Sequence, residues 1–295
     1  MDEQGLVRVF GREIEKIIDN RALVNLEGYP FNNRKIQDIK RYICEPEGQL
    51  IRPRILLETA RSYNANERVA LTCAAIIEIV HSVTLALDDI MDDALLRRNK
   101  KVTFRKYGLD RTILACYDLN PLVNEAIYSL PLNIELRREI SQEINKTQMM
   151  LTQGQEYDTS QTNRAKNLED FAKIFELKTG SLIGAATTIG GLIGNAREGD
   201  IEKLRKFGVY LGIAYQFFDD WKDRYCSEKE VGKSVGLDAR KTTPFDITRP
   251  ELLIAEYFKY RELGMQELGE IKGRNFENII GITLGMFTMP TPKRL

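Results

Sequence analysis

The sequence predicts an all-α fold built as one domain. Apolar residues recur at intervals of three and four along most of the chain, which is the spacing of amphipathic helices. No segment shows the alternation of apolar and polar residues that is typical of a half-buried strand. No obvious linker divides the 295 residues, so we expect a single helical domain over residues 1–295, large enough to bury a substantial core.

The first part of the chain contains an unusually long predicted helix. Helices are expected over residues 4–20, over residues 32–44 and from Ile55 onward. The segment Glu45–Arg54 is rich in helix breakers and is expected to be a loop. Asn64, with Glu67 three residues later, resembles a capping box that would start the long helix. Small and aliphatic residues lie nearly all round this helix, which predicts a central position.

The second part of the chain continues the helical pattern. Further helices are expected over residues 110–130, 133–158, 167–176, 178–194, 200–226, 250–271 and 276–287. A basic connector over residues 100–108 precedes the first of these helices, and Pro121 is expected to kink or divide it. Asp200 is the expected N-cap of the helix over residues 200–226. Residues 228–250, with their Gly, Ser, Thr and Pro, are expected to form a loop.

Charge and hydropathy narrow the classes of protein. Lys plus Arg and Asp plus Glu both number 43, so no net field favours nucleic acid or an anionic membrane as partner. The longest apolar stretches, such as residues 181–194, are short and interrupted by glycine, so no transmembrane segment is expected. The N-terminal residues show no signal-peptide pattern, and we therefore expect a cytoplasmic location.

The chain is poor in the residues that form zinc and iron sites. Four cysteines are scattered without a CxxC pair, which argues against a zinc ribbon or a disulfide framework. His81 is the one histidine, so a multi-histidine metal site is nearly excluded. Carboxylates are the plentiful metal ligands, and they favour a hard ion such as magnesium.

Two acidic motifs follow apolar helical runs. They are Asp88-Asp89-x-x-Asp92 and Asp219-Asp220-x-x-Asp223. In a helix the first and last aspartate of such a motif share a face. A single copy is more often a solvated helix end, but the second copy favours two helices that face each other across a cavity and hold magnesium between them.

Magnesium prefers to share its ligands with substrate phosphate oxygens, so the expected ligand is a diphosphate or triphosphate. The candidate cationic elements that could bind this phosphate ligand are Arg97, Arg98, Lys178-Thr179-Gly180 and Gly232-Lys233. No GxxxxGK[ST] element occurs, which argues against a P-loop.

In their order along the chain, these elements resemble the trans-isoprenyl diphosphate synthases, the head-to-tail prenyltransferases of the polyprenyl synthetase family. Arg52-Pro53 is similar to the family's early G-x-x-x-R-P element, and His81 to the polar residue seven before the first aspartate. The series continues through the first acidic motif with Arg97-Arg98, Gly154-Gln155, Lys178-Thr179-Gly180, Gln216 with the second acidic motif, and Gly232-Lys233.

This resemblance implies a helical bundle of the isoprenoid synthase type with a central substrate cavity, three magnesium ions and a homodimer. The six aspartates would hold the metal ions on an allylic diphosphate, which ionises and is attacked by isopentenyl diphosphate. The catalytic residues would be Asp88, Asp89, Asp92, Arg97, Lys178 and Lys233. The allylic diphosphate would be bound by Arg97, Lys178, Thr179, Gln216 and Lys233, and isopentenyl diphosphate by Gln49, Arg52, His81 and Arg98.

The resemblance also bears on the length of the product, and the sequence departs from the family's pattern at one element. The family stops elongation early with bulky aromatic residues four or five positions before the first aspartate, where this chain has Thr84 and Val83. A product of geranylgeranyl length or longer is therefore implied. Gln49 and Leu50 replace basic residues of the family's G-G-K-R-x-R-P element, and a lost charge-assisted contact costs about 1.5–3 kcal/mol. Arg54 or a neighbouring lysine is a candidate replacement.

Other functions are less well supported by these motifs. A related terpene synthase or diphosphate lyase would ionise the allylic diphosphate without condensation, and Gln49 and Leu50 favour it, whereas Arg98 and the intact second motif disfavour it. A non-catalytic partner subunit would not need complete acidic motifs. An acid/base glycosidase would use paired carboxylates but would not need them as DDxxD on helices.

Overall fold

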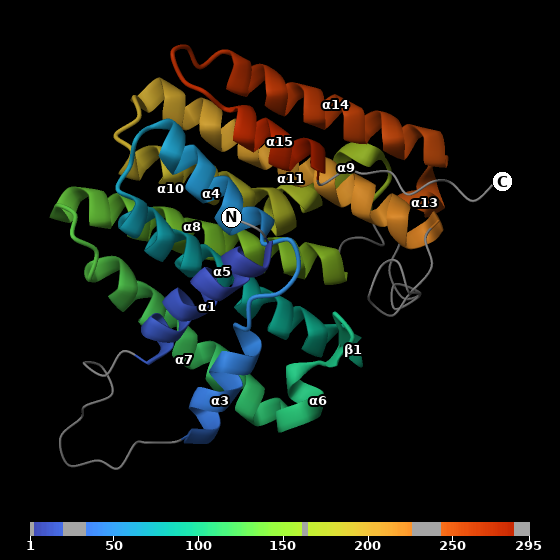
Figure 1. Cartoon of the computed structure of the whole chain (residues 1–295). Helices are drawn as coiled ribbons and strands as arrows, with labels where there is room; N and C mark the ends of the chain where they lie inside the picture. The colour runs from blue at the N-terminus through green and yellow to red at the C-terminus, as the bar shows by residue number, and fades with distance from the viewer. Residues whose placement is uncertain (1–2, 20–33, 161–164, 226–242, 286–295) are drawn as a thin grey trace.

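The computed structural model describes residues 3–19, 34–160, 165–225 and 243–285. Within these ranges the regular secondary structure is helical apart from one small hairpin, and turns connect the helices (Figure 1). The all-α prediction is therefore confirmed. The N-terminal helices are α1 (Glu3–Ile18), α3 (Arg34–Ile43), α4 (Ile51–Ser62) and α5 (Glu67–Met91). The hairpin strands β1 (Leu96–Arg97) and β2 (Lys100–Lys101) are followed by α6 (Thr103–Tyr107), α7 (Leu109–Tyr128) and α8 (Ile134–Ser160).

The remaining elements form the other side of the bundle. They are α9 (Leu168–Phe175), the π-helical turn η2 (Glu176–Gly180), α10 (Ser181–Ile193), α11 (Glu198–Tyr225), α13 (Pro244–Ile247), α14 (Pro250–Gly269) and α15 (Glu277–Gly285). Figure 1 shows α14 along the outer edge beside α11, with α5 and α10 in the interior. Two apolar clusters fill the fold, one around α5 and the other around α11.

The predicted central helix is α5, which packs against α1, α4, α7 and α10. Its first turn is capped by Asn66, whose side-chain oxygen accepts from the backbone N–H groups of Arg68 at 3.0 Å and Val69 at 3.2 Å. The expected cap, Asn64, was wrong, because its positive φ of 56° belongs to the turn that ends α4. By length and composition α5 could cross a membrane, but 72% of the apolar window lies buried inside the fold, as in a core helix.

The loop predicted over residues 45–54 is shorter than expected, because α4 begins at Ile51. Pro53 stands in the first turn of α4, where a missing backbone N–H costs no intrahelical hydrogen bond. Leu50, immediately before the helix, is buried and adopts a left-handed conformation with φ of 47°. The loop therefore ends on an apolar anchor.

The basic connector contains local structure that was not predicted. Strands β1 and β2 form an antiparallel pair with Arg97 opposite Lys100, and the turn residues Arg98 and Asn99 have φ of 51° and 62°. Positive φ at both central residues is typical of a tight hairpin turn. Two-residue strands are too short to show alternation, so the sequence carried no strand pattern here. The short helix α6 follows at once.

Three further expectations need correction. Helix α7 continues through Pro121 without division. Because proline has no N–H, the backbone carbonyl of Tyr117 loses its intrahelical hydrogen bond. Tyr117 is 78% exposed, so water can reach that carbonyl. Helix α11 begins at Glu198, so Asp200 is not its cap; the Asp200 carboxylate instead accepts from the Tyr63 hydroxyl at 3.2 Å. Within the predicted loop over residues 228–250, residues 244–247 form α13, and positions 228–242 lie outside the described residues.

Candidate active site

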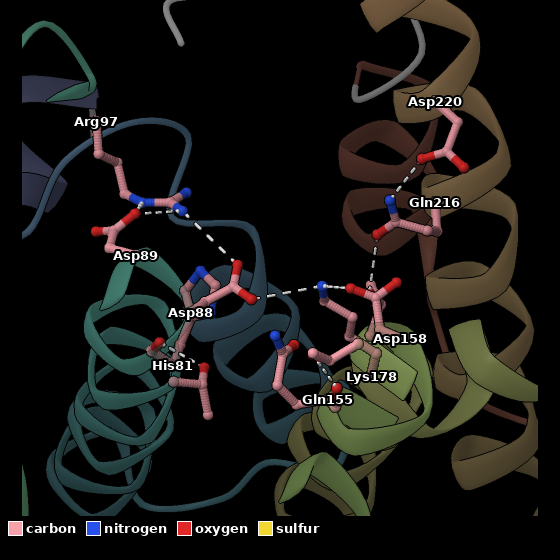
Figure 2. A network of polar contacts seen from close by, with 12 residues as sticks. His81, Asp88, Asp89, Arg97, Gln155, Asp158, Lys178, Gln216 and Asp220 are labelled. Atoms are coloured by element: carbon pink, nitrogen blue, oxygen red, sulfur yellow. Dashed lines mark hydrogen bonds and ion pairs between the residues drawn. The ribbon is translucent and has the colours of Figure 1, made fainter. Parts of the chain in front are cut away.

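The first acidic motif lies at the C-terminal end of α5, and its two adjacent aspartates point in different directions (Figure 2). Asp89 is buried, and its Oδ1 accepts from both Nε and Nη2 of Arg97 at 2.8 Å. Burial raises the pKa of the Asp89 carboxyl, and the Arg97 guanidinium opposes that rise. Asp88 instead faces α8 and η2, and its Oδ2 lies 3.8 Å from Arg97 Nη2. Asp92 is the C-cap of α5 and is partly buried.

Arg97 reaches this motif because the chain folds back after α5. The hairpin places Arg97 on β1, which returns the guanidinium to the end of the helix that precedes it. A reverse turn therefore brings Arg97, one of the cations expected to bind a phosphate, to the first acidic motif. Arg98, at the tip of the hairpin, is exposed.

Lys178 joins the first motif to α8. Its Nζ donates to Asp158 Oδ2 at 2.7 Å and lies 3.5 Å from Asp88 Oδ1 (Figure 2). The π-helical turn η2 carries this lysine, and such turns are frequent at functional sites. Gly154 of α8 allows the close approach, because a Cβ there would lie 2.5 Å from the Lys178 backbone nitrogen. The motif residue Gly154 thus positions Lys178.

A second chain of contacts leads to the second acidic motif on α11. The Thr179 hydroxyl donates to Gln216 Oε1 at 3.0 Å, and Gln216 Nε2 donates to Asp220 Oδ1 at 2.8 Å. Asp219 Oδ1 lies 3.5 Å from Lys222 Nζ. Asp223 belongs to α11, but its side chain lies outside the described residues, as does all of Lys233. Figure 2 shows the Asp88 and Asp220 carboxylates on opposite sides of the space that Lys178 enters.

Two buried polar atoms in this space lack hydrogen-bond partners. Asp88 Oδ1 accepts no hydrogen bond, and Gln155 Nε2 donates none. A carboxylate oxygen that accepts no hydrogen bond and has only the longer ion pair with Lys178 suits a metal ion, and an amide N–H that donates none suits a phosphate oxygen. Within the described ranges, no three His, Cys, Asp or Glu side chains come close enough to form a metal site by themselves. The residues present therefore fit magnesium ions that complete their coordination with substrate oxygens.

The half-site expected to bind isopentenyl diphosphate is centred on Arg52 and His81. Arg52 Nη1 lies 3.1 Å from His81 Nε2. Because a guanidinium only donates, His81 Nε2 must accept and the imidazole must be neutral. Burial, reinforced by Arg52, Arg98 and Arg97, lowers the pKa of His81 well below its usual value. Arg52 Nε is buried without a partner, which leaves one guanidinium N–H available for a ligand.

Glu78 is a buried carboxylate one helical turn before His81. Burial raises its pKa to about 7, while Arg52 and Arg98 act in the opposite direction. Among the other predicted residues of this half-site, Gln49 is exposed at the loop surface. Val83 is buried, and Thr84 is partly buried with its hydroxyl donating to the His81 carbonyl at 2.7 Å.

Sequence reasoning assigned no role to Asp158, Gln155 or Glu78. Gln155 was quoted within the ordered series of motifs, which was the signal available for it. Asp158 lies 20 positions from Lys178 on a different helix, so no local spacing reveals their contact. A single glutamate within an apolar helical run was the signal for Glu78, because such a residue is seldom fully buried without a reason.

Comparison with known proteins supports one family. A family model described as "Polyprenyl synthetase" matches residues 33–245. The farnesyl diphosphate synthase of Bacillus subtilis (strain 168) is 30% identical over 258 residues, which are 84% of each chain. Geranylgeranyl pyrophosphate synthase 4 of Arabidopsis thaliana is 33% identical over 218 residues, covering 71% of this chain and 57% of that one.

Solved structures share the fold. The geranylgeranyl pyrophosphate synthetase of the archaeon Geoglobus acetivorans superposes with a TM-score of 0.78 at 21% identity, covering 96% of this chain and 97% of that one. A geranyltransferase from Helicobacter pylori, solved with magnesium and isoprenyl diphosphate, has a TM-score of 0.78 at 22% identity, with coverage of 97% and 99%. The isoprenoid synthase bundle expected from the sequence is thus confirmed.

Proposed function

The chain belongs to the polyprenyl synthetase family and is a trans-prenyltransferase, and we propose that it condenses isopentenyl diphosphate with an allylic diphosphate in a magnesium-dependent reaction. Two sets of contacts carry this proposal. Lys178 Nζ lies between Asp88 of the first acidic motif and Asp158 of α8, and the neighbouring Thr179 leads through Gln216 to Asp220 of the second motif. Two of the relatives are named as synthases of farnesyl and geranylgeranyl diphosphates, which supports elongation as the activity.

The allylic diphosphate would lie between α5 and α11. Asp88 and Asp92 from the first motif, and Asp219, Asp220 and Asp223 from the second, are the proposed ligands of three magnesium ions. Asp89 is proposed as a contributor that also holds Arg97, since its carboxylate is already paired. When bound, magnesium would stabilise the negative charge on the departing diphosphate. Lys178, Thr179, Gln216, Arg97 and Lys233 would bind the same diphosphate oxygens.

The chain's own residues would orient and stabilise a C–O cleavage. As that bond breaks, both electrons leave with the diphosphate, and Lys178 would balance part of the developing charge. Isopentenyl diphosphate, held by Arg52, His81, Arg98 and Gln49, would present its double bond to the allylic carbon, and a new C–C bond forms. The proton lost from isopentenyl diphosphate would pass to the released diphosphate. The neutral His81 fits a role in binding rather than in proton removal.

Product length is proposed to be geranylgeranyl or longer. Thr84 lies one turn below Asp88 on α5, and its hydroxyl is satisfied by the His81 carbonyl. The side chain therefore presents a methyl group and little bulk toward the growing tail. Val83 is also small and lies in the apolar cluster around α5.

A second copy of the chain is the proposed protein partner. Helix α7 carries large apolar side chains that are exposed: Leu109 at 46%, Ile113 at 46%, Leu114 at 58% and Tyr117 at 78%. Spacings of four and eight residues place Leu109, Ile113 and Tyr117 on one face of the helix. A homodimer would cover this face. We expect light scattering to give twice the 33.9 kDa chain mass, and Leu114→Glu to shift the mass towards the monomer.

Product analysis tests the proposed function. The purified chain is incubated with MgCl2, isopentenyl diphosphate and geranyl, farnesyl or geranylgeranyl diphosphate in turn, and products are identified by mass spectrometry. Elongated prenyl diphosphates are expected. Hydrocarbon or alcohol formed from the allylic diphosphate alone would identify a lyase. No turnover of any allylic substrate by the purified chain would support a non-catalytic subunit.

A further inference from the structure

The proposed binding site for isopentenyl diphosphate has less positive charge than the diphosphate of its ligand has negative charge. It contains the guanidinium groups of Arg52 and Arg98, the neutral His81 and the buried Glu78. A diphosphate carries several negative charges, and two guanidinium groups beside a carboxylate do not balance them. Gln49, the exposed residue at the loop surface, adds no charge. Another cation close to this loop would complete the site.

The basic residues of the hairpin and α6 are mostly engaged elsewhere. Lys100 Nζ contacts two carboxylates, Glu45 at 2.9 Å and Glu47. Arg105 pairs with Asp93, and Lys106 Nζ stands 3.7 Å from the centre of the Tyr42 ring. Recruiting Lys100 would leave two acidic side chains beside the incoming diphosphate. Lys100 therefore holds the hairpin on the loop, whereas Arg105 and Lys106 attach α6 to the end of α5 and to α3.

Arg54 is in a different situation. Its Nη1 donates to the backbone carbonyl of Gln49 at 3.4 Å, the long end of hydrogen-bond distance. Among the described residues no carboxylate pairs with Arg54. The guanidinium thus lies beside Gln49 with only a weak neutral contact, which a phosphate oxygen can replace at small cost.

The Arg98 guanidinium lies beside Gly48, the residue of the same loop that precedes Gln49. Gly48 has φ of 75°, and a Cβ at this glycine would lie 3.6 Å from Cζ of Arg98. The guanidinium groups of Arg98 and Arg54 therefore contact adjacent residues, Gly48 and Gln49, while Arg52 extends from the start of α4 to His81. Two arginine side chains, one from the hairpin and one from α4, therefore adjoin the loop over residues 44–50 that precedes Arg52.

We propose that Arg54 is a binding residue for the diphosphate of isopentenyl diphosphate, and that its guanidinium takes the place of a cation at position 49. This inference rests on the proposed function. The loop conformation favours it: Leu50 is buried and anchors the backbone, so Gln49 stays at the surface and Arg54, within the first turn of α4, can reach back to it.

Steady-state kinetics with each substrate varied in turn test this assignment. Arg54→Ala is expected to raise KM for isopentenyl diphosphate at least ten-fold, with kcat and KM for the allylic diphosphate changed less than three-fold. Arg54→Lys should recover part of the loss. Gln49→Lys in the Arg54→Ala background should restore KM to within about three-fold of the parent, because it returns a cation to the same loop.

Controls separate this role from structural damage. Arg61→Ala removes an arginine from the same helix that pairs with Glu58 and Glu67, and it should leave both KM values unchanged. An unchanged KM for isopentenyl diphosphate in Arg54→Ala, or a ten-fold rise in Lys100→Ala or Lys101→Ala alone, would overturn the assignment to Arg54. If the parent chain forms no elongated product, the proposed function itself fails, which is a separate result.

Discussion

Lys178 Nζ lies 2.7 Å from Asp158 Oδ2 and 3.5 Å from the metal-ligand candidate Asp88. The shorter contact holds the lysine back from the first acidic motif. If Asp158 were removed, the ammonium would be free to close on Asp88 and compete with a metal ion for that carboxylate. Asp158 therefore keeps Lys178 available for a phosphate oxygen.

We predict that Asp158→Asn raises the magnesium concentration needed for half-maximal activity. Charge-assisted hydrogen bonds contribute about 1.5–3 kcal/mol, so a loss of about ten-fold or more in kcat/KM for the allylic diphosphate is expected at low magnesium. Activity should recover partly at high magnesium. Glu139→Gln, an exposed acid on the same helix, is the matched control. A loss that magnesium does not relieve would argue against competition at Asp88.

The contact between Thr179 and Gln216 leads to a second prediction. Thr179→Val keeps the shape of the side chain but removes the hydroxyl that donates to Gln216 Oε1, and Gln216 in turn orients Asp220. A neutral hydrogen bond contributes about 0.5–1.5 kcal/mol, so kcat should fall about two- to ten-fold. Single-turnover assays would measure it. Thr152→Val, whose hydroxyl contacts only its own helix at an exposed position, should leave the rate unchanged.

The tail-binding position can be tested by adding bulk. Thr84→Phe places a ring one turn below Asp88 and should shorten the main product by at least one isoprene unit. Each buried methylene contributes about 0.8 kcal/mol, so blocking a five-carbon unit is a large energetic change. Products are compared by mass spectrometry after reaction of geranyl diphosphate with isopentenyl diphosphate and MgCl2. An unchanged product distribution would exclude Thr84 from the wall of the tail site.

The buried Glu78 predicts a pH dependence of stability. Its carboxyl ionises near pH 4.5 in the unfolded chain but near pH 7 in the folded protein. Between these values the folded state binds more protons, so the unfolding free energy falls as pH rises and then levels off above pH 7. The full effect is on the order of 3 kcal/mol.

Denaturant unfolding of the parent and of Glu78→Gln at pH 5 and pH 8 measures this effect. The glutamine variant lacks the titrating group, so its stability relative to the parent should be greater at pH 8 than at pH 5. Arg52 and Arg98, which face Glu78, keep their charge over this range. Equal pH dependence of the two proteins would show that Glu78 ionises normally.

Much of this architecture was predictable because it depends on periodicity and motif order. The helix that became α5 shows apolar residues all round, and burial of that helix followed from the pattern. The placement of the two acidic motifs at the ends of buried helices required only the runs that precede them. The helical fold was therefore accessible from residue order, whereas the contact of Arg97 with Asp89 depends on the hairpin, which was not predicted.

The parts that were missed depend on contacts between distant segments or on short-range geometry. Strands β1 and β2 have two residues each, too few for an alternating pattern. Asn66 rather than Asn64 caps α5, because the chain needs a left-handed residue at Asn64 to leave α4. The pairing of Lys178 with Asp158 joins a π-helical turn to another helix, and no spacing rule encodes it.

Both acidic motifs are proposed to hold one diphosphate through magnesium. Isothermal titration calorimetry tests this with an unreactive thiolodiphosphate analogue of the allylic substrate, titrated in MgCl2 or in EDTA. The proteins compared are the parent, Asp88→Asn, Asp220→Asn and the double variant. We predict that binding requires magnesium and is at least ten-fold weaker in each single variant. The loss in the double variant should be clearly smaller than the product of the two single losses, because both motifs hold the same ligand. Tight binding in EDTA, or a single variant within two-fold of the parent, would contradict the claim.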